Sequence, residues 1–247
     1  MIRLIALREL RSLFHAPSTW FILGALQFIL AYSYLARLDA YLQLQPQLAL
    51  IASAPGATQW IAPGLAGTVA LVMMTLTPVF TMRLLAEERR NKTLALLMAA
   101  PVSARQIVLG KFSGLLLFLS LVIFASTAMA LTLALGTPMD FGLLFANAAG
   151  LLLLTASYAA LGLYISSLTA QPIVAAIGAL IVSFGLKAVE EYGSDGNRAL
   201  IALTPTGHFR SFNAGLLDSS DVAYFMLFCA FFLLLTMRRI HNNHIYG

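Results

Sequence analysis

The sequence predicts an all-α, polytopic membrane protein with six transmembrane helices. Of its 247 residues, 60% are hydrophobic and only 10% are charged, whereas soluble domains carry about 25% charged residues. The charged residues gather in short segments between six long apolar stretches. Because a lipid bilayer is the solvent in which such an apolar surface is stable, these observations predict a membrane protein rather than a soluble fold.

The first element is an amphipathic helix over residues 1–17. Isoleucine, leucine and phenylalanine are interleaved with Arg3, Arg8 and Arg11 along this stretch. That pattern is typical of a helix lying on the membrane surface. Pro17 is expected to end the helix, and Ser18 is placed to cap the next one.

Six stretches are long and apolar enough to cross the hydrocarbon core, which needs roughly 20 residues of helix. They are residues 19–36, 64–85, 108–135, 141–166, 172–188 and 222–237. Pro78 lies inside the second stretch, Asp140 is placed to cap the fourth, and Pro172 stands in the first turn of the fifth. The fifth and sixth stretches are the shortest, so we expect them to tilt little.

The distribution of basic residues predicts the orientation. An even number of spans puts both termini on one side, and eleven of the fifteen Lys and Arg residues fall on that side. Since cytoplasmic loops carry the excess of Lys and Arg, both termini are expected in the cytoplasm. The net charge of +5 therefore reflects orientation in the bilayer. We expect no nucleic-acid partner, because that requires a solvated basic face.

The segment between the second and third spans, residues 87–101, is predicted to hold a short cytoplasmic helix. Leu94, Leu97 and Met98 share one face, and Pro101 ends the helix. Ser103 and Gln106 have the spacing of a capping box that opens the next helix. An apolar face on the cytoplasmic side favours docking to another protein. The alternative is a charged loop whose helix rests on the membrane interface.

The external segment, residues 190–221, mixes acidic residues with short apolar pieces. It is too short for a folded domain, so we expect helices half-sunk in the outer leaflet. The segment serves either as a lid over an export path or as a connector.

Three stretches resemble ABC-2-type permeases. The amphipathic entry is Arg8-Glu-Leu-Arg-Ser-Leu-Phe-His-Ala-Pro17, and the cytoplasmic coupling segment is Glu87-Glu-Arg-Arg-Asn-Lys-Thr-Leu-Ala-Leu-Leu-Met-Ala-Ala-Pro-Val-Ser103, continuing to Gly110-Lys111. The closing stretch, His208-Phe-Arg-Ser-Phe-Asn-Ala-Gly215 with Asp221-Val-Ala-Tyr-Phe225 and Phe232-Leu-Leu-Leu-Thr236, is similar to permeases of the gliding-motility (GldF-like) type. The resemblance runs nearly from end to end.

This resemblance implies a type V exporter-like architecture in which two permease copies form the path above two separate cytoplasmic ABC ATPase subunits. ATP and magnesium would be bound by those ATPases. It also implies that residues of the coupling segment pass ATPase motion to the spans: Glu87, Glu88, Arg89, Arg90, Thr93, Leu94, Leu97, Met98 and Pro101. Members of the gliding-motility type pair with an auxiliary membrane protein that has a large external domain.

The chain is expected to bind no nucleotide, cofactor or metal itself. Gly110-Lys111 is a partial phosphate-loop pattern, but Arg105 stands where the first glycine belongs and Phe112 replaces the Ser or Thr that would hold magnesium. We find no catalytic constellation, so the protein is expected not to be an enzyme, and ATP hydrolysis is expected on a partner chain.

The polar candidates for a transport path are Gln27 in the first span and Thr75 and Thr77 in the second. For Gln27, helix packing is the alternative role. Ala175, Ala179 and Ser183 repeat at four-residue spacing in the fifth span. Small residues at that interval let helices approach closely, either inside one chain or between two permease copies.

The function predicted from the sequence is therefore the permease subunit of an ATP-driven transporter, working in export or in force transmission across the membrane. A secondary carrier or channel without an ATPase is one alternative, although the central spans contain almost no ionisable residue. A membrane scaffold for a surface machine is another. Neither the spans nor the external segment carries a ligand signature, so the sequence predicts no substrate.

Overall fold

The computed structural model describes residues 1–48, 56–91, 103–192 and 202–245. These residues form helices and contain no strand. Six stretches are long and apolar enough to cross a membrane: Pro17–Gln47, Ala57–Arg90, Ala104–Leu135, Phe141–Leu168, Pro172–Tyr192 and Ser219–Asn242. The predicted all-α class with six spans is thus confirmed.

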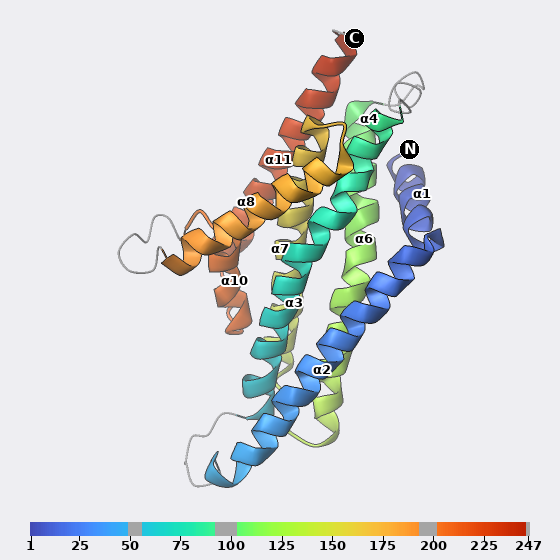
Figure 1. Cartoon of the computed structure of the whole chain (residues 1–247). Helices are drawn as coiled ribbons and strands as arrows, with labels where there is room; N and C mark the ends of the chain where they lie inside the picture. Colours follow the sequence, from blue (N-terminus) through green and yellow to red (C-terminus); the bar gives the residue numbers. More distant parts are fainter. Residues whose placement is uncertain (49–55, 92–102, 193–201, 246–247) are drawn as a thin grey trace.

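Three helices form the centre of the bundle: α3 (Ala57–Met82), α6 (Ala104–Leu131) and α7 (Phe141–Leu168). Their facing side chains, among them Met73, Phe118 and Tyr158, are fully buried. Around this centre lie α2 (Pro17–Leu48), α8 (Pro172–Tyr192) and α11 (Ser219–Ile245) (Figure 1). These outer helices expose large apolar side chains such as Phe21 and Ile173, which suits contact with lipid.

The first helix, α1 (Ile2–His15), packs against the beginning of α6. Two glycines one helical turn apart, Gly110 and Gly114, make this approach possible. A Cβ atom on Gly114 would lie 2.8 Å from the carbonyl oxygen of Ala6. On the opposite side of α1, Leu4, Leu7 and the arginines are exposed. One face of the predicted amphipathic helix is thus covered by α6, and the other is free to meet the membrane surface.

The second span extends further than the apolar pattern indicated. After Met82 the chain makes a π-helical turn, η1 (Arg83–Glu87), and continues into α4 (Glu88–Arg90). The Ser166 hydroxyl of α7 completes this turn, because it accepts a hydrogen bond from the Ala86 amide at 3.0 Å and donates one to the Met82 carbonyl at 3.2 Å. A side chain inserted into the backbone ladder is a known cause of such turns. Residues 83–90 therefore continue the helix of the second span.

The ends of the helices follow the expected chemistry. The Ser103 hydroxyl accepts from the Gln106 amide, and the Gln106 side chain accepts from the Ser103 amide, so the capping box opens α6. Asp140 caps α7 by accepting from the Leu143 amide at 3.0 Å. At its other end α6 tightens into a short 3-10 turn, η2 (Thr132–Leu135).

The last part of the chain departs from a simple up-and-down bundle. Figure 1 shows α8 running obliquely away from α7. A further helix, α10 (Pro205–Asn213), lies beside the middle of α7, where Phe212 packs on Gly150. An ion pair of 2.7 Å between Arg210 and the buried Glu190 ties α10 to the end of α8. The oblique path of α8 brings Glu190 to this partner.

The contact between α1 and α6 can be tested with glycine substitutions. We expect Gly114→Ala to lower the free energy of unfolding by about 1–3 kcal/mol, because its methyl group meets backbone atoms of α1 that cannot move away. Gly67→Ala in α3 is the matched control, since a Cβ there meets nothing within 4 Å. Thermal unfolding in detergent measures both. A Gly114→Ala variant as stable as the control would contradict the close approach.

Candidate functional site

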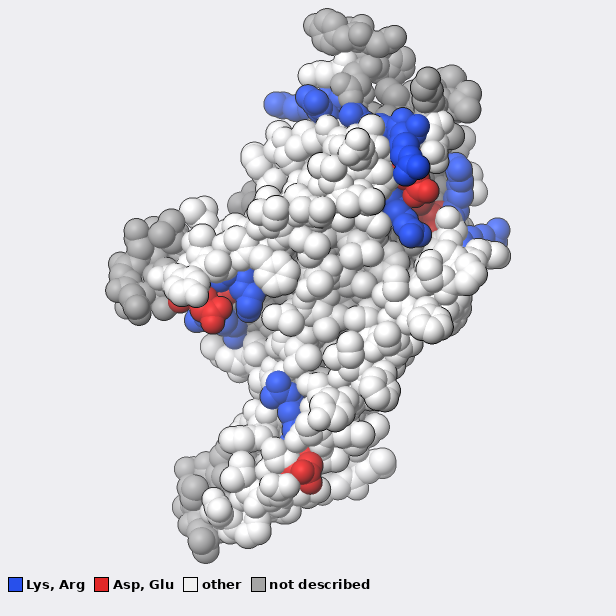
Figure 2. Space-filling view, in the orientation of Figure 1, with Lys and Arg blue, Asp and Glu red and all other residues white. Residues whose placement is uncertain are grey.

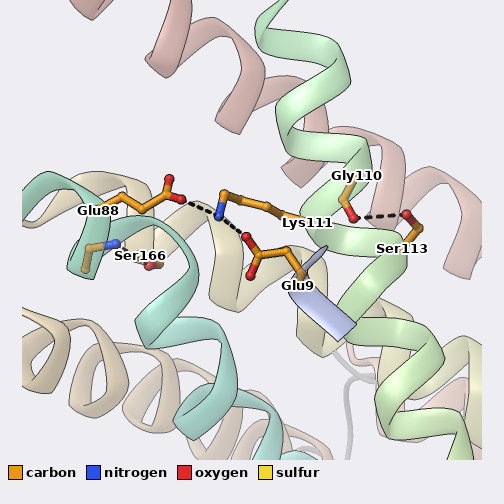
Figure 3. Close-up of polar contacts among 7 residues, drawn as sticks. Glu9, Glu88, Gly110, Lys111, Ser113 and Ser166 are labelled. Carbon is orange, nitrogen blue, oxygen red and sulfur yellow. Dashed lines mark hydrogen bonds and ion pairs between the residues drawn. The ribbon is translucent and has the colours of Figure 1, made fainter. Parts of the chain in front are cut away.

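A buried lysine joins three segments of the chain at the end of the bundle where α1 and α4 lie. The Lys111 side chain is only 2% exposed, and its ammonium group lies 2.6 Å from Glu9 Oε1 and 2.7 Å from Glu88 Oε1. Figure 3 shows the ammonium between the two carboxylates. We call these three residues the Lys111 cluster.

Each member of the Lys111 cluster comes from a different helix. Lys111 stands in the second turn of α6, Glu9 comes from α1, and Glu88 begins α4. An ammonium group away from water is very costly unless carboxylates compensate its charge. The close packing of α1 on Gly110 and Gly114 brings Glu9 within reach, and the π-helical turn carries Glu88 to the other side of the ammonium group.

An open cavity of about 590 Å³ borders the Lys111 cluster. Its walls come from α1, the start of α2, the end of the second span and Lys111 of α6, and they carry both signs of charge. The charged and polar lining residues are Arg8, Glu9, Ser12, Thr19, Arg83, Glu87, Glu88, Asn91 and Lys111. Within the described ranges, no group of three His, Cys, Asp or Glu side chains is arranged to hold a metal ion.

Aromatic contacts lock the same helices together next to the ion pairs. The ring of Phe118 in α6 meets Phe14 of α1 at 5.4 Å and Phe80 of α3 at 5.0 Å, in both cases edge to face. Trp20 of α2 donates its indole N–H to the Phe14 carbonyl at 2.8 Å. Such ring pairs stabilise packing beyond the area that they bury. The Lys111 cluster thus lies next to tightly packed aromatic side chains of α1, α3 and α6.

This arrangement can transmit a displacement. The span that ends with α4 leads directly into residues 92–102, which carry the predicted docking face. Any movement of α4 acts on α6 through the pair of Glu88 and Lys111, and on α1 through Lys111 and Glu9. It also acts on α7 through the Ser166 hydroxyl at the π-helical turn.

Four residues of the predicted coupling segment lie in the described part of the chain. Glu88 belongs to the Lys111 cluster, Glu87 lines the neighbouring cavity, Arg90 is exposed, and Arg89 is half-buried. The remaining predicted residues, Thr93, Leu94, Leu97, Met98 and Pro101, lie outside the described residues.

Sequence reasoning missed Lys111 and Glu9 as partners of Glu88. Lys111 was considered only as part of a partial phosphate-loop pattern and of the family resemblance. The position of Lys111 before a long apolar run gave no signal of a negative partner, because a lysine near the end of a span can extend its side chain to the membrane interface. Which of the acidic residues supplies that partner depends on the packing of α1.

The predicted transport-path residues do not meet in one place. Gln27 donates to the sulfur of Met129 at 3.0 Å and so links α2 to α6. Thr75 is exposed and bonds to the Leu71 carbonyl, whereas Thr77 is buried and bonds to the Met73 carbonyl. Each threonine thus satisfies its hydroxyl within its own helix.

The small residues of α8 face the interior of the single chain. Ala175, Ala179 and Ser183 are at most 1% exposed, and α8 packs there against α3 and α7. A side chain already covered by its own chain is not available to a second copy. The structure therefore favours internal packing over the alternative of an interface between permease copies.

A second set of polar side chains lies between the two ends of the bundle, where Figure 2 shows a separate patch of acidic and basic residues. Besides the pair of Arg210 and Glu190, His208 Nδ1 lies 2.6 Å from Asp221 Oδ1 and Nε2 lies 2.9 Å from the Ala202 carbonyl. Tyr224 stacks on the His208 ring. These contacts hold the described part of the predicted external segment against α8 and α11.

The sequence matches a known protein family. Residues 4–190 match the family model described as "ABC-2 family transporter protein". The matched region contains all members of the Lys111 cluster, the first four spans and nearly all of the fifth. No curated protein matches the sequence.

The Lys111 cluster predicts a specific loss of stability. We expect Lys111→Met to cost about 3–5 kcal/mol, because it leaves two carboxylates without the cation between them. The triple variant Glu9→Gln/Glu88→Gln/Lys111→Met should recover part of that loss, since its groups are neutral. Thermal unfolding in detergent measures the effect. Arg105→Met removes an exposed charge from the same helix and should be nearly neutral; an equal loss in both single variants would contradict the prediction.

Proposed function

Because the chain belongs to the ABC-2 family of transporter proteins, we propose that it is the membrane-spanning permease subunit of an ATP-binding cassette transporter. It works as a dimer, and a separate cytoplasmic ATPase, which binds ATP and magnesium, drives it. Its role is export or the transmission of force across the membrane.

The Lys111 cluster is the observation that carries this proposal. A permease driven from outside needs a firm connection between the segment that the ATPase contacts and the helices that move. Buried ion pairs supply such a connection between α4, α6 and α1. Neither a secondary carrier nor a passive scaffold requires a coupling of this kind at one end of the bundle.

The distribution of charge supports a cytoplasmic location for this end. Figure 2 shows most of the Lys and Arg residues gathered where α1, α4 and the end of α11 lie. Cytoplasmic loops carry the excess of Lys and Arg. We therefore place both termini, the Lys111 cluster and residues 92–102 on the cytoplasmic side of a bacterial inner membrane.

The narrower assignment to the gliding-motility type rests on the closing stretch of the sequence. The family match ends at residue 190, whereas that stretch begins at His208. On this proposal an auxiliary membrane protein with a large external domain would contact the external side, to which the segment 190–221 belongs.

Docking of the ATPase can be tested at the predicted apolar face. We expect the double variant Leu94→Asp/Leu97→Asp to lose the co-expressed ATPase in a pull-down while still inserting into the membrane, because two charges replace the contact surface. Leu42→Asp, an exposed position in the part of α2 that follows Arg37, is the control and should keep the ATPase. If the double variant retains the ATPase as well, residues 94 and 97 are not the docking face.

The orientation can be tested independently with single cysteines. In a Cys229→Ala background, Asn91→Cys should react with an impermeant thiol reagent only from the cytoplasmic side, and Gly136→Cys only from the outside. Both positions are exposed. Asn91 follows α4 and Gly136 follows η2 at the far end of α6, and these two segments lie at opposite ends of the bundle (Figure 1). Labelling of intact cells and of inverted vesicles separates the two sides. The opposite pattern would reverse the topology and remove the ATPase from the proposal.

A further inference from the structure

An asparagine inside the bundle has an amide group without a partner. Asn147 of α7 is 4% exposed, and neither its Nδ2 nor its Oδ1 atom has a hydrogen-bond partner among the residues that the structure describes. A buried amide left in this state costs about 1–3 kcal/mol in a protein interior. Lipid offers no replacement partner, so such a group needs one inside the bundle.

Asn147 differs from the other buried polar groups of this kind. Thr155 and Ser183 each carry a single hydroxyl that can rotate toward a carbonyl of its own helix. An asparagine amide has two N–H donors and an acceptor oxygen in one rigid plane. Rotation about the side chain cannot satisfy all of them within a helix, and therefore Asn147 points to an additional ligand.

A small cavity lies next to the Asn147 side chain, where α3, α6 and α7 meet. Its volume is about 20 Å³. The walls are mostly small or apolar residues, including Ala62 and Ala66 of α3 and Ala130 of α6, all of them buried. One water molecule needs about 10–15 Å³ of such space, so the cavity has room for one water.

Two hydroxyls on the opposite wall complete the polar surroundings. Ser126 donates its proton to the Val122 carbonyl at 2.8 Å, and Thr127 donates to the Ile123 carbonyl at 2.9 Å. Both residues line the cavity, and their hydroxyl oxygens keep lone pairs that can accept. A water molecule has two protons to donate and two lone pairs to accept with, which matches acceptors on α6 and an amide donor on α7.

We propose that this cavity binds one structural water molecule that accepts a hydrogen bond from the Asn147 amide and donates to Ser126 on α6. The water bridges α6 and α7, which have no direct polar contact at this point among the described residues. The site is independent of the proposed transport function, since it rests only on the cavity and its lining.

The direct test is a density map of the full-length protein at a resolution that shows ordered water. We expect density within hydrogen-bond distance of both the Asn147 amide and the Ser126 hydroxyl. An empty cavity in a map that shows ordered water at other sites would overturn the proposal.

A double-mutant cycle tests the bridge in solution. With Asn147 present, Ser126→Ala should lower the Tm by about 2–4 °C, the shift expected for loss of one hydrogen bond in a chain of this size. In the Asn147→Leu background the same change should have little effect, because no amide remains to hold the water. Ser120→Ala is the control on the same helix, outside the cavity, and should shift the Tm equally in both backgrounds. Equal effects of Ser126→Ala in the two backgrounds would overturn the bridge.

Discussion

The burial of one positive charge organises the end of the molecule at which α1 and α4 meet. A lysine ammonium group out of reach of water needs carboxylates around it, since its desolvation is otherwise prohibitive. In this chain the two carboxylates come from segments 102 and 23 residues away in the sequence. Lys111 therefore fixes where α1 docks and where the second span ends. Burying the ammonium group without its carboxylates would cost free energy, and this requirement is what holds the three helices together at one specific place.

Two local features of the backbone bring the two carboxylates to Lys111. Gly110 and Gly114 let α1 approach α6 closely enough for Glu9 to reach the ammonium group. The π-helical turn holds one residue more than an α-helical turn, which rotates the following side chains by roughly 100° about the helix axis. That rotation sets the direction of Glu88, and Ser166 satisfies the backbone groups that the turn sets free. Local departures from ideal geometry thus concentrate where the charges have to meet.

Much of the fold could be predicted from the sequence, because the bilayer imposes simple length and polarity rules. Six apolar stretches, the capping box at Ser103 and the cap at Asp140 all follow from local patterns. The site could be predicted only in part. Glu88 was expected to matter, but its pairing with Lys111 depends on tertiary contacts that no spacing encodes. The pairing of Glu190 with Arg210 likewise depends on the oblique path of α8, which no local pattern encodes.

The two ends of the central helices are held in different ways, and this difference bears on how the bundle can move. Near Lys111, charged and aromatic contacts bind α1, α3, α6 and α7 into one unit, so a displacement of α4 is shared among them. Toward the other end, α6 and α7 face each other across small residues and the cavity beside Asn147. Under the proposed function, a displacement that enters at the Lys111 cluster would therefore move the helices joined there together. Near Asn147 it would instead shift α6 relative to α7.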